Sequence, residues 1–150
     1  ALRAIFTPGH EIDHVCYYLP GEKVLFTGDT VLGASSSTVR DLRSYMRSLR
    51  VLARLGHRTI CPAHGPVVPY PRGRRLVQTY ISHRQDREDQ VKKALSEGFD
   101  TAEQIARSIY PKNLRKGLRA GAEGNVRAHL DKLSQEGEVE VIGARYRLTG

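Results

Sequence analysis

Apolar and polar residues follow a different period in each half of the chain. In the first half, the runs at 15–19 and 23–26 are rich in Val, Tyr, Leu and Phe and predict two strands joined by the turn at Pro20-Gly21. From 39 to 55 the apolar residues recur every three or four positions, which predicts an amphipathic helix capped by Thr38 with Asp41 and ended by Gly56. A short apolar run at 59–61 predicts a buried strand. This order is typical of an α/β domain.

The second half has helical spacing with few breakers. A long helix is predicted from residue 76 to Gly98, a second from Asp100 and Thr101 to Pro111, and a third over roughly 123–136. Two short runs, 138–142 and 145–148, flank a Gly-Ala turn and predict a hairpin. Helices followed by a hairpin are the order of a winged helix-turn-helix. We therefore expect two domains, 1–75 and 76–150.

Composition and charge exclude several classes of protein. With 150 residues, 39% apolar and 27% charged, the chain is an ordinary globular protein and neither disordered nor fibrous. It has no run of about 18 apolar residues, so we expect no membrane-spanning helix. Two cysteines, Cys16 and Cys61, are too few for a disulfide scaffold and favour an intracellular, reducing compartment. The net charge of +8 favours an anionic partner.

Three segments place a metal-binding residue type after an apolar strand and a tight turn. They end in His10, Asp29 and His64. Loops at one edge of a sheet converge, and imidazole and carboxylate groups are the ligands that zinc prefers. The sequence therefore predicts that these three side chains meet in a metal site.

The segments TPGHEIDH, FTGDTVLG and CPAHGPV resemble the third, fourth and fifth motifs of the metallo-beta-lactamase superfamily. The resemblance extends over nearly the whole chain. It implies an α/β fold: the C-terminal half of an αββα sandwich, followed by a small winged-helix-like α+β domain. It also implies a site for two zinc ions, in which His10 binds one ion, Asp29 bridges both and His64 binds the other. Asp29 could in addition accept a proton from the attacking water. For His14 the resemblance suggests a supporting or substrate-side role in catalysis; the alternative is a strand-end histidine bonded to backbone.

The chain also departs from the family pattern. The His-x-His-x-Asp-His motif of the family's N-terminal half is absent, and a dinuclear site needs about twice the three ligands present. We expect a fragment that is inactive alone and is completed by the missing N-terminal half. A second chain, for example in a homodimer, or a degenerate site are the alternatives. Ala63 stands where the family usually has glycine, and would add about 1 kcal/mol of strain if that position needs a positive φ.

The substrate class depends on the basic residues. The resemblance implies a zinc-dependent hydrolase, and one branch of the superfamily cleaves single-stranded RNA in mitochondria. We therefore expect an endoribonuclease of the mitochondrial matrix or cytoplasm, with RNA or another anionic substrate as its partner. Fungal members of the family imply the alternative of an acyl-carrier thioesterase, and an incomplete site would leave a non-catalytic binding or assembly component. Candidate RNA contacts on one helix are Arg40, Arg43, Arg47, Arg50 and Arg54, although a solvated face whose arginine stems cover apolar surface is the favoured interpretation of this row. Candidates on another helix are Arg127, His129 and Lys132, which could equally belong to a packing or dimerisation face.

Overall fold

The computed structural model describes residues 1–150, and the contacts within it define two units, Ala1–His83 and Arg84–Gly150. Helix α2 (Arg72–Ser96) contributes to both, so a boundary at residue 75 falls inside one continuous helix. None of the helices combines the length and the apolar character that crossing a membrane requires.

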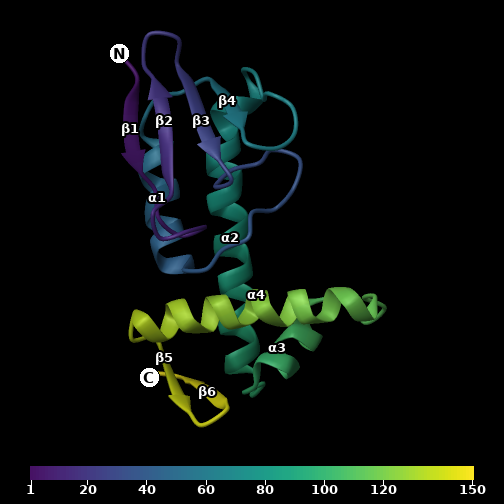
Figure 1. The fold of residues 1–150 in the computed structure, drawn as a ribbon. Helices are drawn as coiled ribbons and strands as arrows, with labels where there is room; N and C mark the ends of the chain where they lie inside the picture. Colours follow the sequence, from purple (N-terminus) through teal and green to yellow (C-terminus); the bar gives the residue numbers. More distant parts are fainter. The chain divides into compact units, whose positions relative to one another are not determined.

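The first unit is built on a four-stranded sheet in the order β1-β2-β3-β4 (Figure 1). The strands are β1 (Arg3–Phe6), β2 (Val15–Leu19), β3 (Val24–Gly28) and β4 (Thr59–Pro62). The pairs β1/β2 and β2/β3 are antiparallel, whereas β3/β4 is parallel. Strands β1, β3 and β4 therefore run in the same direction and end at the same edge, where β2 begins. This topology brings together the loops that carry the predicted metal ligands.

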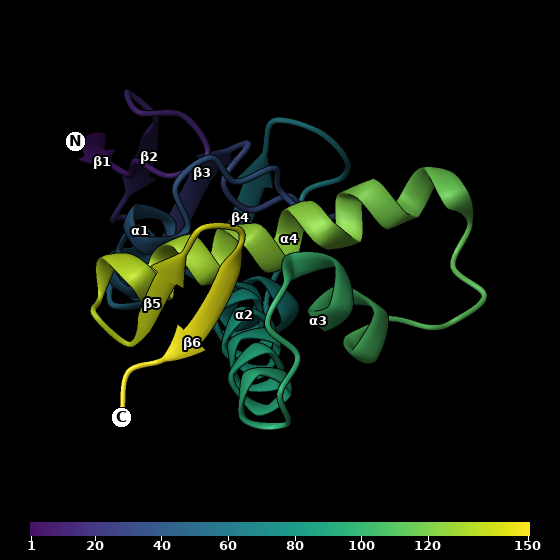
Figure 2. The same cartoon turned by 90° about the horizontal axis from the view of Figure 1, so that it is seen from below.

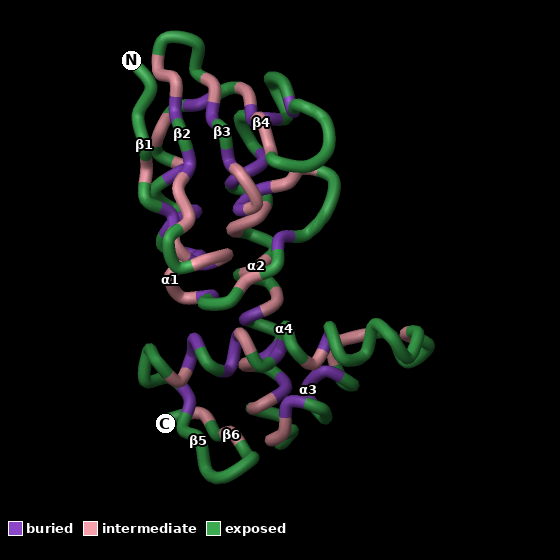
Figure 3. Tube along the Cα trace, viewed as in Figure 1, coloured by how far each residue is buried: buried purple, intermediate pink, exposed green.

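The two faces of this sheet differ in burial. Side chains alternate between the faces along each strand, and Figure 3 shows this alternation along β2 and β3. One face is buried under α1 (Leu42–Ala53) and the first part of α2, through residues such as Cys16, Tyr18, Leu25 and Ile60. On the other face Phe6 is 64% exposed, and its neighbours Tyr17 and Phe26 are also exposed. The result is an exposed apolar sheet face.

Helix α1 begins later than the sequence predicts. Its N-cap is Asp41, whose side chain accepts hydrogen bonds from the Ser44 amide at 3.3 Å and the Ser44 hydroxyl at 2.7 Å. The predicted cap at Thr38 is wrong because residues 38–41 are held by another loop: the Gly9 carbonyl accepts hydrogen bonds from the amides of Arg40 and Asp41. The apolar stripe is otherwise confirmed, since Leu42, Met46 and Leu49 are buried.

The second unit has the element order expected of a winged helix (Figure 2). The C-terminal part of α2 is followed by α3 (Ala102–Ile109), α4 (Lys116–Gln135) and the hairpin of β5 (Val139–Ile142) and β6 (Arg145–Leu148). Helix α3 and the hairpin lie along different stretches of α4. Thr101 caps α3 by accepting a hydrogen bond from the Gln104 amide. Helix α4 starts at Lys116, not near residue 123, because glycines at 117, 121 and 124 hide the helical pattern.

A buried ionic cluster occupies the core of this unit. Lys132 is 5% exposed, and its ammonium lies 2.7 Å from Glu88 and 2.9 Å from Glu136. His129 is 1% exposed, with its Nδ1 3.6 Å from Glu88. The expectation that Lys132 and His129 face a nucleic acid is therefore wrong: both side chains point into the unit and are used in packing. Arg127 is exposed but paired with Glu123 at 2.5 Å.

Candidate metal centre

The edge where β1, β3 and β4 end brings the three predicted ligands together around Asp29. Its Oδ2 lies 3.8 Å from Nε2 of His10, and its Oδ1 lies 3.0 Å from Nε2 of His64. The side chains are 21%, 38% and 75% exposed for His10, Asp29 and His64. One carboxylate thus serves both imidazoles, one oxygen each, at a place that solvent can reach.

Helix α1 holds the loops of this edge. The Ser48 hydroxyl donates a hydrogen bond to the Pro8 carbonyl at 2.8 Å in the His10 loop. The Tyr45 hydroxyl donates to the Thr30 carbonyl at 2.6 Å in the Asp29 loop. A backbone hydrogen bond from the Ala63 amide to the Gly28 carbonyl, 2.9 Å, ties the His64 loop to the Asp29 loop. The ligands therefore project from segments fixed by buried contacts rather than from free loops.

The hydrogen bond to His10 fixes which of its ring nitrogens is available. Nδ1 of His10 lies 2.7 Å from the Thr38 carbonyl, and a carbonyl can only accept, so Nδ1 carries the proton. In the neutral ring Nε2 then presents a lone pair toward the Asp29 carboxylate. The Nε2 lone pair of His10 and the Asp29 carboxylate are both electron-rich, so a cation between them would stabilise the pair. A backbone carbonyl that accepts a hydrogen bond from the other ring nitrogen is common for metal-binding histidines.

His14 lies next to this group but is held differently. Its Nδ1 is 2.9 Å from the Thr7 hydroxyl and 3.1 Å from the Thr30 hydroxyl, and both threonines are fully buried. Burial lowers the pKa of His14, and the nearby His10 lowers it further. The ring meets the His10 ring edge-on at a centroid distance of 6.0 Å. The side chain is thus bonded to two buried hydroxyl groups that hold its ring beside His10, and its role in catalysis stays a prediction.

Backbone conformation leaves no room for a side chain at Gly28. Its φ is +54°, and a Cβ there would lie 2.6 Å from Nε2 of His14.

Ala63 does not have a positive φ, so the backbone strain that the sequence analysis considered for this alanine is absent. The positive φ in that loop belongs to Gly65, at +85°.

The donor set fits metal ions that share a carboxylate better than it fits one ion. No three His, Cys, Asp or Glu side chains surround a common point as the ligands of a single ion would. Two pairs are formed instead, His10 with Asp29 and His64 with Asp29. Two imidazoles and a carboxylate are borderline donors suited to zinc. The candidate centre therefore consists of two imidazoles that face the two oxygens of one carboxylate.

Most of the predicted arginine row on α1 is accessible. Arg40 is paired with Glu11 at 3.0 Å beside the site, and Arg43 is half-buried. Arg47, Arg50 and Arg54 are exposed and form no ion pair or side-chain hydrogen bond. Arg40 precedes the start of α1 at Leu42, so the expectation that it lies on this helix is wrong; the other four arginines extend from Arg43 to Arg54 over about 16 Å at 1.5 Å per residue.

The supporting groups Thr7, Thr30 and the Thr38 carbonyl could not be found from the sequence. Both threonine side chains lie inside the quoted motifs, but threonine is common after strands. Only the antiparallel pairing of β1 and β2, which puts Thr7 opposite His14, gives Thr7 its role.

Known proteins resemble both parts of the chain in sequence. Residues 1–64 match the metallo-beta-lactamase superfamily, and residues 101–147 match the beta-lactamase-associated winged helix domain. A lactamase-like protein of Trichophyton verrucosum is 50% identical over 95 residues. An atrochrysone carboxyl ACP thioesterase of Aspergillus fumigatus is 48% identical over 94 residues. A beta-lactamase-like protein 2 homolog of Caenorhabditis elegans is 36% identical over 140 residues, which is 93% of this chain.

The fold of the chain is also similar to that of a solved structure. A metallo-beta-lactamase family protein of Thermus thermophilus superimposes with a TM-score of 0.76 and 29% identity over 99% of this chain. The chain spans only part of these proteins: 49% of the Thermus protein, and 32%, 29% and 46% of the Trichophyton, Aspergillus and Caenorhabditis proteins.

Proposed function

Since this chain carries a metallo-beta-lactamase superfamily domain over residues 1–64 and the associated winged helix over residues 101–147, we propose that it forms half of a two-zinc hydrolase. Members of the superfamily are metal-binding hydrolases. The observation that carries the proposal is the Asp29 carboxylate, which presents one oxygen to His10 and the other to His64. A carboxylate that presents its two oxygens to two different imidazoles has the geometry expected of a ligand that bridges two metal ions.

Each residue of the centre has a separate role in this proposal. His10 and His64 would each hold an ion through Nε2, and Asp29 would be shared between the ions. When bound, zinc would supply a water of near-neutral pKa and polarise the electrophile. Because both Asp29 oxygens face an imidazole, the role as proton acceptor that the sequence suggested for this carboxylate is not part of the proposal. His14, bonded to Thr7 and Thr30, supports the Gly28 corner from which Asp29 projects.

The remaining ligands come, in this proposal, from an N-terminal half that covers the exposed sheet face. Phe6, Tyr17 and Phe26 form a contiguous apolar surface on that face, and covering it is favourable by about 25 cal/mol per Å². Hydroxyl-radical footprinting tests this. The three rings should be modified in the 150-residue chain and protected in a longer protein that includes such a half, whereas equal modification in both would contradict it. A homodimer of this chain would instead protect the rings at high concentration.

The positive charge of the chain favours RNA as the substrate. In this proposal the RNA is cleaved in the mitochondrial matrix or cytoplasm. The chain carries +8, and the unpaired arginines at 47, 50 and 54 extend from the centre along α1. Phosphodiesters are the most abundant polyanions that a metal-activated water can cleave, and paired arginine–phosphate contacts suit a row of this kind.

A thioesterase is the second candidate because the Aspergillus relative is named as one and shares 48% identity. A thioester carbonyl would take the place of the phosphorus as electrophile at the same two ions. The third candidate is a binding component without catalytic activity. It would keep the fold but lack a complete set of metal ligands.

The test compares Asp29→Ala with Asp13→Ala in a protein that contains the N-terminal half. Asp13 is an exposed carboxylate near the same loop that forms no ion pair or side-chain hydrogen bond, so it is a matched control. Chelator-sensitive cleavage of unstructured RNA is expected from the wild type and from Asp13→Ala, and a loss on the order of 1,000-fold from Asp29→Ala. Wild-type kcat in Asp29→Ala contradicts the bridging role. Hydrolysis of acyl-pantetheine without RNA cleavage would identify the protein as a thioesterase. A folded protein that binds no zinc would identify it as a non-catalytic binding component.

A further inference from the structure

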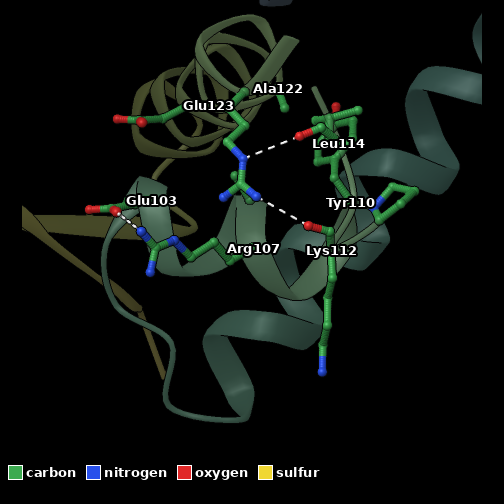
Figure 4. Close-up of a pocket in the computed structure, with 10 residues that line it drawn as sticks. Glu103, Arg107, Tyr110, Lys112, Leu114, Ala122 and Glu123 are labelled. Atoms are coloured by element: carbon green, nitrogen blue, oxygen red, sulfur yellow. Dashed lines mark hydrogen bonds and ion pairs between the residues drawn. The ribbon is translucent and has the colours of Figure 1, made fainter. Parts of the chain in front are cut away.

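A pocket of about 450 Å³ opens between α3 and the start of α4 in the second unit (Figure 4). Its apolar lining is provided by Ala106, Tyr110, Pro111, Leu114 and Ala122. The volume lies within the range of about 300–1,000 Å³ that is usual for small-ligand sites. Neither the metal centre nor the arginine row on α1 uses this pocket, since both belong to the first unit.

The segment around the pocket is strongly basic. Residues 104–122 contain no Asp or Glu, and their basic residues are Arg107, Lys112, Arg115, Lys116 and Arg119. Two of them are engaged with the protein: Arg107 pairs with Glu103 at 2.6 Å, and Arg119 donates to the carbonyls of Lys112 and Leu114. These contacts are visible in Figure 4, where the Lys112 ammonium extends away from both Glu103 and Glu123.

The other three cations are unpaired. Lys112, Arg115 and Lys116 are exposed and form no ion pair or side-chain hydrogen bond. Lys112 lines the pocket, and Arg115 and Lys116 directly follow the lining residue Leu114, so three unpaired positive charges lie on the segment that bounds the pocket. The carboxylates at the pocket do not cancel them, because Glu103 is paired with Arg107 and Glu123 with Arg127.

The aromatic ring in the pocket is held in place. The Arg87 guanidinium lies over the Tyr110 ring at 4.2 Å, and Asn125 donates a hydrogen bond to the Tyr110 hydroxyl at 3.4 Å. Since Arg87 covers one face of the ring, a planar base would contact the part of Tyr110 that lines the pocket, and the cations on the bounding segment suit the attached phosphates. An acidic peptide would use the charges, and would fill the pocket only through an aromatic or apolar side chain of its own.

We propose that the α3–α4 pocket, together with Lys112, Arg115 and Lys116, binds a nucleotide of single-stranded RNA, with the base in the hollow and the flanking phosphates on the three cations. This inference rests on the proposed RNA substrate and adds a second contact site remote in sequence from the metal ligands. It replaces the expected contact through Lys132 and His129, which are buried.

The charge part is tested with the 150-residue chain and a fluorescent oligouridylate, by anisotropy at several salt concentrations. The variant is Lys112→Ala/Arg115→Ala/Lys116→Ala. Losing up to three phosphate contacts should weaken binding at least about tenfold and lower the slope of log Kd against log salt by up to about 2, at about 0.7 per contact. The control Lys93→Ala/Arg145→Ala/Arg147→Ala removes the same charge from exposed, paired residues and should leave the slope unchanged. Equal effects of both triples overturn the proposal.

The base part is tested by NMR. The methyl signals of Ala106 and Ala122 should shift with oligouridylate and stay in place with an abasic ribose-phosphate oligomer. Equal affinity for the abasic oligomer and for oligouridylate overturns the proposal. Tighter binding of polyglutamate than of RNA also overturns it and indicates an acidic protein partner.

If the wild-type chain binds no RNA, the proposed RNA substrate fails together with the pocket. If RNA binds but the Lys112 triple changes nothing, only the pocket fails.

Discussion

At the scale of single residues, the metal centre depends on groups that are hydrogen-bonded behind the ligands. The Thr38 carbonyl sets the tautomer of His10, and the Thr7 and Thr30 hydroxyls hold His14. A histidine that is free to change tautomer would present the wrong nitrogen for part of the time. The ligand residues are thus only part of what makes the site.

Gly28 offers a direct test of this arrangement. Gly28→Ala places a Cβ 2.6 Å from Nε2 of His14 at a φ of +54°, and should lower the free energy of unfolding by about 2 kcal/mol. Gly21→Ala is the matched control, because nothing lies within 4 Å of its Cβ; it should change stability by less than about 0.5 kcal/mol. Urea denaturation measures both. Equal stability of the two variants would show that the His14 ring moves aside freely.

At the scale of elements, α1 and α4 are fixed by polar contacts that their own sequence patterns do not disclose. The cap of α1 lies at Asp41 rather than Thr38 because the His10 loop binds the chain just before the helix. Helix α4 is joined to α2 through Glu88, Lys132 and His129, all nearly completely buried. Periodicity places a helix in the chain but does not identify the polar groups that pair inside a core.

The α2–α4 cluster predicts a loss of stability in acid. Burial alone would raise the pKa of Glu88, but the neighbouring His129 ring and Lys132 ammonium lower it to about 2. A depressed carboxyl pKa means that its stabilisation is present above the unfolded value of 4.5 and is lost as the pH falls toward 2. Burial also lowers the pKa of His129, so protonation of this ring adds to the loss below pH 6.5. We expect a decrease of about 3 kcal/mol in unfolding free energy across this range.

Variants separate this effect from general acid denaturation. Glu88→Gln should be less stable at pH 7 by about 2 kcal/mol, because the buried Lys132 ammonium loses one of its two carboxylate partners and keeps only Glu136. Glu88→Gln/Lys132→Met should recover much of that loss and show a flatter pH profile. Urea unfolding from pH 7 to pH 3 provides the measurement. A wild-type profile in the double variant would assign the acid sensitivity to other carboxylates.

At the scale of the whole molecule, the excess positive charge is distributed over distinct surfaces. The arginines at 47, 50 and 54 lie on α1, and the unpaired cations at 112, 115 and 116 lie at the α3–α4 turn. Many other basic residues are paired with carboxylates, as Lys92 is with Glu138 and Arg145 with Asp100. Net charge alone indicates an anionic partner, whereas the pairing shows which cations can reach it.

The α1 row is tested by its salt dependence. Arg47→Ala/Arg50→Ala/Arg54→Ala should reduce the slope of log Kd against log salt for single-stranded RNA by up to about 2. Arg43 is left intact because its Nε is buried. The triple at 93, 145 and 147 again controls for charge. An unchanged slope would identify the α1 arginines as a solvated face.

The sequence by itself determined most of the elements and indicated the residue types of the candidate centre. Period-2 and helical spacing, with Pro-Gly and Gly turns, predicted the strands at 15–19 and 59–61, the wing hairpin and the apolar stripe of α1, because these depend on local geometry and burial of one face. The residue types at 10, 29 and 64, each just after a strand, indicated a metal centre for the same local reason.

Tertiary structure decided which polar groups meet. The order β1-β2-β3-β4 brings the ends of three strands to one edge and lets Asp29 face both His10 and His64. Packing of α4 on α2 turned Lys132 inward, and the turn before α4 gathered unpaired cations beside a pocket that no pattern marks. Such pairings depend on distances between segments far apart along the chain, and a sequence period carries no information about those distances.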